Sequence, residues 1–440
     1  MLTSLYSGIS GLKAHTKKLD VIGNNIANVN TTGFKSSSVN FTTMLNQTIK
    51  GATSAQDGRG GTNPQQVGLG VTIGSIDQNM SGGSLQSTGV TTDLAIEGDG
   101  FFVLENGGSS LYTRSGATTF DEDGNLVNSA NGLYVQGWMA GADVDGDGKK
   151  DVDTNGDLEA ISLTSSMPAR ASEKINCTGN LDASAEIDDN HTTSISVYDS
   201  LGTKHTVELE FKKVANNDWS YTVTNVDGAN IDSGDTGTIR FDTNGDVQGI
   251  DAGNTGTFTN LDGDGNGNIT DAELKAALPK LEVSPTGGAA LNQTITLDFS
   301  EITQYGDVAM SAKAETADGY AAGELEGITI DSAGVITGSY KNGQLETIGQ
   351  IAMATFNNPA GLSQEAGTMY AESNNSGQPV ISTAGVGNAG VIKPSNLEMS
   401  NVDLSKELTE MITTQRGFQA NSKIITTGDQ ILEQLVNLKR

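Results

Sequence analysis

The chain has 440 residues and a formal net charge of −29, from 54 acidic and 25 basic side chains. This excess of negative charge argues against a nucleic acid as partner, because two polyanions repel each other. A chain of this length holds about three domains by the usual size of domains, and its 56 glycines and 5% aromatic residues favour short strands and tight turns.

Residues 2–29 are predicted to form one amphipathic helix that ends in a run of turn-forming residues. The apolar side chains are spaced alternately by three and four residues, a pattern that keeps one seam of a helix against a partner helix. Thr16 and Gly23 interrupt this seam, so the isolated helix is expected to be weak. The residues of this helix predicted to mediate assembly are Leu2, Leu5, Ile9, Leu12, Leu19 and Ile26.

The middle of the chain is predicted to be β structure. Residues 31–70, rich in Ser, Thr, Gln, Asn and Gly, are expected to be either an extended linker or disordered. Residues 71–142 and 301–399 contain short apolar runs separated by turn formers, which predicts one discontinuous inner β domain. Residues 143–300 contain alternating runs and are predicted to form an inserted outer β domain or domains. The predicted fold class is therefore mainly β with α-helical termini.

An acidic run at residues 143–157 contains two half calcium loops, each with oxygen ligands at the first, third and fifth positions and a glycine at the sixth. Neither has the closing glutamate, because Thr154 and Ser162 stand at the twelfth positions. A shared calcium site and a solvated acidic turn both fit this pattern, and either would have a structural role. The candidate ligands are Asp143, Asp145, Asp147, Asp151, Asp153, Asn155 and Asp157.

A stronger metal motif lies at residues 262–273, which match the twelve-residue calcium loop at every position. Gly267 allows the sharp bend, and Glu273 closes the loop as a bidentate carboxylate. The sequence before the motif is Thr- and Gly-rich, so the entering helix is missing, and the alternative is an Asp-Gly turn. Calcium is expected as a structural ion, and no other cofactor is expected. The predicted ligands are Asp262, Asp264, Asn266, Asn268, Thr270 and Glu273.

The C-terminal residues 400–440 repeat the heptad spacing of the N-terminal helix, with interruptions at Gln415, Ser422 and Asp429. The two terminal helices, within residues 1–30 and 400–440, are expected to pair with each other and with neighbouring copies as an inner-core domain. The residues of the second helix predicted to mediate assembly are Leu404, Leu408, Met411, Phe418, Ile425 and Leu432.

Features typical of enzymes are missing from the sequence. It contains no P-loop, dinucleotide fingerprint or nucleophile elbow, and His15, His191 and His205 lack ligand spacing. The single cysteine, Cys177, excludes an internal disulfide; a buried, inert thiol is expected, and a reactive thiol is the alternative. No apolar stretch is long enough to span a bilayer, and no cleavable signal peptide is recognisable.

Several segments resemble one family. Residues 4–12 and 19–35, the latter ending in Asn-Thr-Thr-Gly-Phe-Lys, are similar to the N-terminal signature of the bacterial flagellar rod, hook and hook-associated proteins. Residues 401–421 look like the matching C-terminal signature. The segments similar to the first body domain of that family are residues 93–103, 112–116, 318–320 and 349–356. The large insertion at residues 141–300 resembles the hook members of the family more than its distal-rod members.

The resemblance implies a structural subunit of the flagellar hook, which self-assembles into a flexible tube and transmits torque from rod to filament. It implies that the terminal helices form a coiled-coil inner layer, with β domains outside. It also implies export through the flagellar type III apparatus to the cell exterior, and contacts with the distal rod, the hook cap and the hook–filament junction proteins. No nucleic acid and no membrane insertion are expected.

Two alternatives stand beside this interpretation. Within the family, the chain could be a distal-rod or hook-associated protein; from a different class, the acidic loops would suit a calcium-stabilised surface adhesin or binding module. Self-assembly separates the two classes. In spirochaete relatives a hook cysteine is cross-linked to a lysine, which implies a cross-link at Cys177, although those relatives have Asn after the cysteine and this chain has Thr178.

Overall fold

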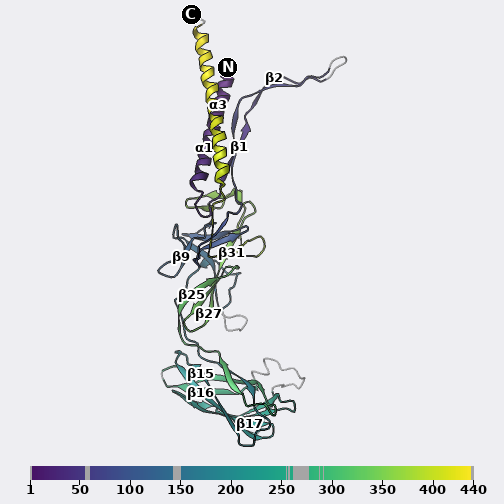
Figure 1. The fold of residues 1–440 in the computed structure, drawn as a ribbon, viewed down its shortest axis with the longest axis vertical. Helices are drawn as coiled ribbons and strands as arrows, with labels where there is room; N and C mark the ends of the chain where they lie inside the picture. The colour runs from purple at the N-terminus through teal and green to yellow at the C-terminus, as the bar shows by residue number, and fades with distance from the viewer. Residues whose placement is uncertain are drawn as a thin grey trace. The chain divides into compact units, whose positions relative to one another are not determined.

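Figure 1 shows the fold as a computed structural model. It describes residues 2–54, 60–141, 150–253, 255, 258–260, 277–286, 288–290 and 292–437. The chain divides into two compact units. Unit 1 comprises Met1–Thr164, Ile328–Gly338 and Leu345–Arg440, and unit 2 comprises Ser165–Gly327 and Ser339–Gln344. Each unit is described separately.

The two ends of the chain form long helices that pack against each other in unit 1: α1 (Leu2–Ala27) and α3 (Leu404–Asn437), which lie side by side in Figure 1. Asp403 caps the start of α3, because its Oδ1 atom accepts hydrogen bonds from the backbone N–H groups of Ser405 (2.9 Å) and Lys406 (3.2 Å). The prediction of a mainly β chain with α-helical termini is confirmed.

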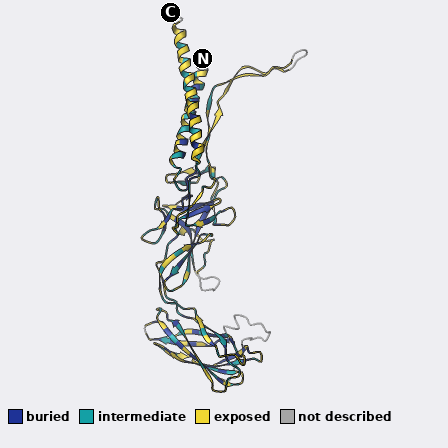
Figure 2. Cartoon of the chain, viewed as in Figure 1, coloured by how far each residue is buried: buried dark blue, intermediate teal, exposed yellow. Residues whose placement is uncertain are grey.

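A hairpin follows α1. Its inner ladder pairs β1 (Ser37–Thr43) with β4 (Val71–Gln78), and its outer ladder pairs β2 (Asn46–Lys50) with β3 (Gln65–Gly68), both antiparallel. The inner ladder contacts α1, whereas every residue of β2 and β3 is exposed (Figure 2). Within the segment expected to be an extended linker or disordered, β1, β2 and β3 are hydrogen-bonded strands, because antiparallel pairing satisfies their backbone N–H and C=O groups.

The other strands of unit 1 form one large antiparallel sheet and two small ones. β27 (Leu345–Thr355) pairs with β11 (Tyr134–Met139), β7 (Phe101–Asn106) and β30 (Val380–Thr383). From β27 the sheet also continues through β26 (Val335–Tyr340) to β25 (Gly323–Ile330). Its further strands include β8 (Ser109–Thr113), β9 (Thr118–Phe120), β10 (Leu126–Asn128), β12 (Glu159–Ala160), β28 (Ser363–Gln364) and β29 (Met369–Ala371). The small sheets pair β5 (Leu85–Ser87) with β32 (Asn396–Glu398) and β6 (Leu94–Glu97) with β31 (Val391–Pro394). A short 3-10 helix, η1 (Pro359–Gly361), precedes β28.

The core of this sheet lies on both of its faces. Phe102 and Leu104 of β7 belong to one buried apolar cluster, and the alternate residues Phe101 and Val103 belong to another. Successive side chains of a strand point to opposite faces, so β7 is covered on both sides. This explains why residues 101–104 read as a continuous apolar run rather than an alternating one.

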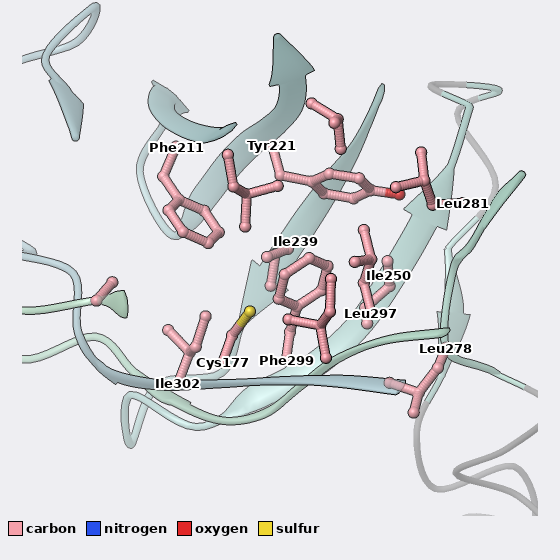
Figure 3. Packing of buried hydrophobic residues seen from close by; sticks show 14 of the residues in the cluster. Cys177, Phe211, Tyr221, Ile239, Ile250, Leu278, Leu281, Leu297, Phe299 and Ile302 are labelled. Carbon is pink, nitrogen blue, oxygen red and sulfur yellow. The ribbon is translucent and has the colours of Figure 1, made fainter. Parts of the chain in front are cut away.

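Unit 2 is a sandwich of two sheets. The first, in spatial order, contains β18 (Ala229–Ser233), β22 (Lys280–Pro285), β23 (Gln293–Thr303), β14 (Lys174–Asn180) and β24 (Lys313–Ala317). The second contains β15 (Asn190–Tyr198), β16 (Lys204–Ala215), β17 (Asp218–Val226), β19 (Thr236–Phe241), β20 (Val247–Ala252) and β21 (Thr259–Asn260). One apolar cluster fills the space between them (Figure 3). The short β13 (Ser166–Met167) pairs with the start of β25 (Gly323–Ile330), and β26 (Val335–Tyr340) follows.

The unit boundaries differ from the boundaries predicted for the inserted domain, 143 and 300. Unit 2 begins at Ser165, because β12 before it pairs with β11 of unit 1. It continues to Gly327, because β23 runs through residue 300 and β24 then pairs with β14. The change of composition near residue 143 therefore lies within unit 1 rather than at a domain boundary.

Candidate assembly surface

The seam between α1 and α3 is lined by small residues. A Cβ atom added to a seam glycine would fall between 2.7 and 3.3 Å from a side-chain atom of the opposite helix. The pairs are Gly8 with Ile425, Gly11 with Asn421, Gly417 with His15 and Gly428 with Leu5. The glycines leave room for side chains of the opposite helix, including Leu5 and Ile425 at the inner edge of their stripes, so the two helices approach closely.

Polar contacts fix the register of this seam. The side chain of Asn25 donates a hydrogen bond to Glu407 Oε1 (3.1 Å), and Lys18 Nζ lies 3.1 Å from Glu410 Oε2. Asn25 also exchanges hydrogen bonds with the backbone of Ser37 in β1 (2.8 and 3.0 Å). Burial raises the pKa of Glu407 above its usual range. The buried side-chain amide of Asn25 thus links α1 with both α3 and the hairpin.

The apolar stripes predicted to mediate assembly lie beside this seam and remain accessible. On α1, Ile9 is 41% exposed; Leu5, Leu12, Leu19 and Ile26 are half-buried, and the side chain of Leu2 lies outside the described residues. On α3, the exposed fractions of Leu404, Leu408 and Phe418 are 42%, 44% and 38%, and Met411, Ile425 and Leu432 are half-buried. Figure 2 shows exposed residues along both helices. The α1–α3 contact therefore leaves much of each stripe uncovered.

Unit 1 also contains a buried ion cluster that was not predicted from the sequence. Glu398 Oε1 lies 2.6 Å from Lys35 Nζ, and its Oε2 lies 3.4 Å from Arg114 Nη1. All three side chains are at most 3% exposed. Oε1 also accepts the backbone N–H of Gly83 (2.8 Å), and Lys35 donates to the carbonyl oxygen of Ser81 (2.8 Å). Burial lowers the pKa of Lys35, against the opposing effect of Glu398.

This cluster joins three stretches that are far apart in the sequence: the segment after α1, the inner β strands and the segment before α3. Asn401 adds to the junction, because it accepts the backbone N–H of Ser36 (2.8 Å) and donates to the carbonyl oxygens of Asn79 (2.8 Å) and Ser81 (3.0 Å). The only available signal was indirect: Lys35 and Arg114 stand inside the segments that carry the family resemblance.

The stronger calcium motif, residues 262–273, lies outside the described residues, as do Asp143, Asp145 and Asp147 of the weaker one. Among the described residues, no group of three or more His, Cys, Asp and Glu side chains could hold a metal ion. Asp151 is half-buried, and Asp153, Asn155 and Asp157 are exposed.

The described half of the weaker motif forms hydrogen bonds within its own turn. Asp153 Oδ1 accepts hydrogen bonds from the backbone N–H (2.9 Å) and the side-chain amide (3.2 Å) of Asn155. The similar sequence Asp242–Asp246 does the same, because Asp242 Oδ1 accepts the N–H groups of Asn244 (2.8 Å) and Asp246 (2.9 Å). Such acidic turns are satisfied by local hydrogen bonds alone, which favours the acidic-turn alternative at this position.

Cys177 lies on β14 and points into the core of unit 2, where 1% of it is exposed (Figure 3). Burial, with the nearby charge of Asp298, raises the pKa of its thiol to about 12. A buried thiol of high pKa is a poor nucleophile. Its position is the one expected for an inert core cysteine.

Comparison with known proteins covers most of the chain. Four family models match: Flagella basal body rod protein at residues 5–35, Flagellar hook protein FlgE/F/G D1 domain at 95–198, Flagellar basal body protein FlaE D2 domain at 166–320 and Flagellar basal body rod FlgEFG protein C-terminal at 393–438.

Full-length relatives decide the family. The chain is 40% identical over 473 residues to a flagellar hook protein FlgE of Treponema pallidum, and 41% identical over 463 residues to that of Borreliella burgdorferi. In both comparisons the match covers 100% of each chain. The FlgE of Escherichia coli is 34% identical, with 98% of each chain covered. The chain belongs to the flagellar hook protein family.

The hook family accounts for the fold and for the lack of catalytic motifs. A solved structure, the hook protein FlgE2 of Helicobacter pylori, has the same fold with a TM-score of 0.51 and 13% identity, over 71% of this chain and 100% of that one. Hook proteins are structural proteins of the flagellum, so the chain is not an enzyme. Within the described residues, no helix is both long and apolar enough to cross a membrane.

Proposed function

We propose that the chain is the repeating subunit of the flagellar hook and that it polymerises through its paired terminal helices into a tube that carries torque from rod to filament. One observation carries the mechanism: α1 and α3 meet where glycines face side chains of the opposite helix, while other apolar side chains beside that seam stay exposed. Burying exposed apolar surface stabilises association by about 25 cal/mol per Å², so these stripes are the surface that neighbouring subunits would cover.

The assembly residues are therefore the predicted apolar positions of both helices, with Ile9, Leu404, Leu408 and Phe418 the most accessible. The family context supports further parts of the proposal: contacts with the distal rod, the hook cap and the hook–filament junction, export by the flagellar type III apparatus without a cleaved signal, and final location outside the cell. The proposal of an adhesin or binding module has no comparable support, since the full-length relatives are flagellar hook proteins.

Polymerisation of purified protein tests this function. Replacing Leu408 with Asp should raise the concentration needed for polymerisation at least tenfold, because a charge would enter a surface that assembly buries. Gln419→Ala, at an exposed position of the same helix, is the matched control and should polymerise as the unaltered chain does. Removing residues 2–30 should abolish the polymer. An unaltered chain that stays monomeric under all polymerising conditions would contradict the proposal.

We also propose that residues 262–273 bind calcium as a structural ion. The support is the match of oxygen ligands to all positions of the loop. Calcium at 100 times its dissociation constant would stabilise the folded chain by about 2.7 kcal/mol. Thermal unfolding in calcium and in chelator measures this shift, which Glu273→Gln should remove. Asp271→Asn, at a position of the loop that supplies no side-chain ligand, should keep it; an identical response of both variants would refute the site.

A further inference from the structure

An open groove lies in unit 1 between α1 and the hairpin, with a volume of about 680 Å³. Its apolar lining includes Tyr6, Ile9, Met44, Leu69 and Val71. Tyr6, Ile9 and Met44 are 67%, 41% and 44% exposed, which is unusual for such large apolar side chains. The groove is thus an apolar surface with no occupant in the described part of the chain.

Two lysines border the groove on α1. Lys13 and Lys17 are four residues apart, so they lie on one face of the helix, about 6 Å apart along its axis. Lys17 makes an exposed ion pair with Asp20 (3.3 Å), whereas Lys13 makes no ion pair with any described residue. The groove therefore presents two positive charges with helical spacing beside an apolar floor.

The C-terminal end of α3 has the complementary properties. The helices run antiparallel, with Asn25 against Glu407 and Leu5 against Gly428, so the N-terminal end of α1 lies near residue 428 of α3. α3 continues to Asn437, about 13 Å further at 1.5 Å per residue, and extends past the N-terminus in Figure 1. This helix end, residues 429–437, exposes 43% of Ile431 and 67% of Val436.

The helix end also carries two acidic residues with the same spacing as the lysines. Asp429 and Glu433 are exposed and four residues apart, and neither makes an ion pair with a described residue. Lys439 and Arg440 follow in the sequence, beyond the helix end and outside the described residues. At about 100° per residue, Val436 lies on the same face as Asp429 and Glu433, whereas Ile431 lies on the opposite face. The helix end thus presents an exposed apolar side chain beside two negative charges at a spacing of about 6 Å.

We propose that the helix end of one copy docks in the groove of a second copy, with Asp429 and Glu433 opposite Lys13 and Lys17. Exposed ion pairs add little affinity, so the charges set the register while Val436 enters the apolar part of the groove. The two surfaces differ, so each copy can give its helix end to one neighbour and receive another, which builds an open polymer rather than a closed dimer. This contact rests on the proposed hook function and specifies one interface of that assembly.

Charge reversal tests the contact in the full-length chain. Lys13→Glu with Lys17→Glu should raise the concentration needed for polymerisation at least tenfold, and so should Asp429→Lys with Glu433→Lys. A chain carrying all four changes should polymerise within about threefold of the unaltered chain, because the pairs are restored with reversed sign. Lys423→Glu, an exposed lysine of α3 away from both surfaces, is the matched control and should have no effect.

A disulfide experiment identifies the occupant even where a charge reversal impairs folding. In a Cys177→Ala background, Ile9→Cys and Val436→Cys should yield disulfide-linked ladders of copies in the oxidised polymer. A disulfide within one chain would show that the groove binds its own helix end, and its absence in a well-formed polymer would show that another surface fills it; both refute the contact while hook assembly stands. If the unaltered chain forms no polymer at all, the proposed function fails instead.

Discussion

Glu398 illustrates how a single side chain can hold a junction between distant segments. Its carboxylate meets Lys35, Arg114 and the backbone of Gly83, and the whole cluster is shielded from water. Removing one partner of a buried ion cluster leaves the other charges unpaired in a medium of low polarity. Such a cluster therefore affects the free energy of unfolding mainly when one of its partners is removed.

Glu398→Gln should destabilise unit 1 by about 3–5 kcal/mol, the usual cost of leaving buried charges unpaired. Urea unfolding followed by circular dichroism measures the change. Glu324→Gln is the control, because Glu324 pairs with Lys341 at 2.6 Å on the surface, and it should leave the unfolding midpoint unchanged. Equal effects of the two variants would show that burial does not matter here.

Gly33 is required for a different reason. Its φ angle is +68°, and an added Cβ atom would lie 2.6 Å from the backbone nitrogen of Ser115. Gly33→Ala should therefore cost more than the 1–2 kcal/mol of the left-handed conformation alone, by about 1–3 kcal/mol of overpacking. Gly343 has φ +83° with no atom within 4 Å of the added Cβ. Gly343→Ala should show the backbone cost only, and the difference between the two variants in urea unfolding isolates the clash.

Cys177 offers a chemical test of the predicted cross-link. Because the thiol is buried and its pKa is raised to about 12, native monomer should react with iodoacetamide far more slowly than the same chain in urea. Mass spectrometry of assembled polymer then decides the chemistry of this residue. If Cys177 peptides carry only the free thiol, the cross-link is absent; a lysine-linked peptide would show that the core of unit 2 opens during assembly.

At the level of elements, the seam of the helix pair responds to pH through Glu407. Burial raises the pKa of this carboxyl above its usual value of about 4.5. Below pH 4.5 the carboxyl group of Glu407 is protonated in both the folded and the unfolded chain, so its burial does not lower the stability. As the pH rises through the raised pKa, the folded chain must hold a buried charge, so stability falls.

Glu407→Gln should therefore stabilise the α1–α3 pair at pH 7 and change little at pH 4. Glutamine keeps an oxygen to accept the hydrogen bond of Asn25. Thermal unfolding of helical circular dichroism at the two pH values provides the comparison. A variant that is less stable than the unaltered chain at pH 7 would mean that the carboxylate contributes a favourable interaction there.

The elements also show where sequence patterns suffice. Heptad spacing located both terminal helices, because amphipathic periodicity is a local property. It did not show the glycines at which the helices meet, such as Gly8 and Gly11. Leu5 and Ile425 of the predicted stripes nevertheless pack against seam glycines. Glycines do not contribute to hydrophobic periodicity. Their role in close packing can be recognised only when the position of the partner helix is known.

The outer strands of the hairpin after α1 could not be predicted from a local sequence pattern. β2 and β3 consist largely of Asn, Gln, Thr and Gly and bury no residue, so neither alternation nor apolar content marks them as strands. Their pairing depends on β1 and β4, which join residues up to 41 positions apart, as in the pair of Ser37 with Gln78. The buried cluster of Lys35, Arg114 and Glu398 escaped for the same reason, since its members are separated by hundreds of residues.

At the scale of the whole molecule, the candidate assembly surfaces all belong to unit 1. Unit 2 has its own apolar core, and its chain leaves and returns through paired strands, because Met167 of β13 lies opposite Gly323 of β25. A two-residue Asn-Gly turn can join residues so placed in an antiparallel pair. The insertion is thus removable without breaking the strands that flank it.

Replacing residues 168–322 by Asn-Gly should leave a chain that still polymerises, because the helix pair, the hairpin and the groove are retained. Sedimentation and electron microscopy of the shortened chain measure this. A shortened chain that keeps the helical circular dichroism of the full chain yet forms no polymer would show that unit 2 supplies an essential contact.

The buried hydrogen bond between Asn25 and Glu407 joins residues 382 positions apart. No portion of the chain that stops before residue 407 contains both partners, so a ribosome must translate through residue 407 before the two helices can meet. Until then α1 is a weak helix without its partner. The proposed assembly surface therefore forms only after unit 2 has been translated, which delays self-association of incomplete chains.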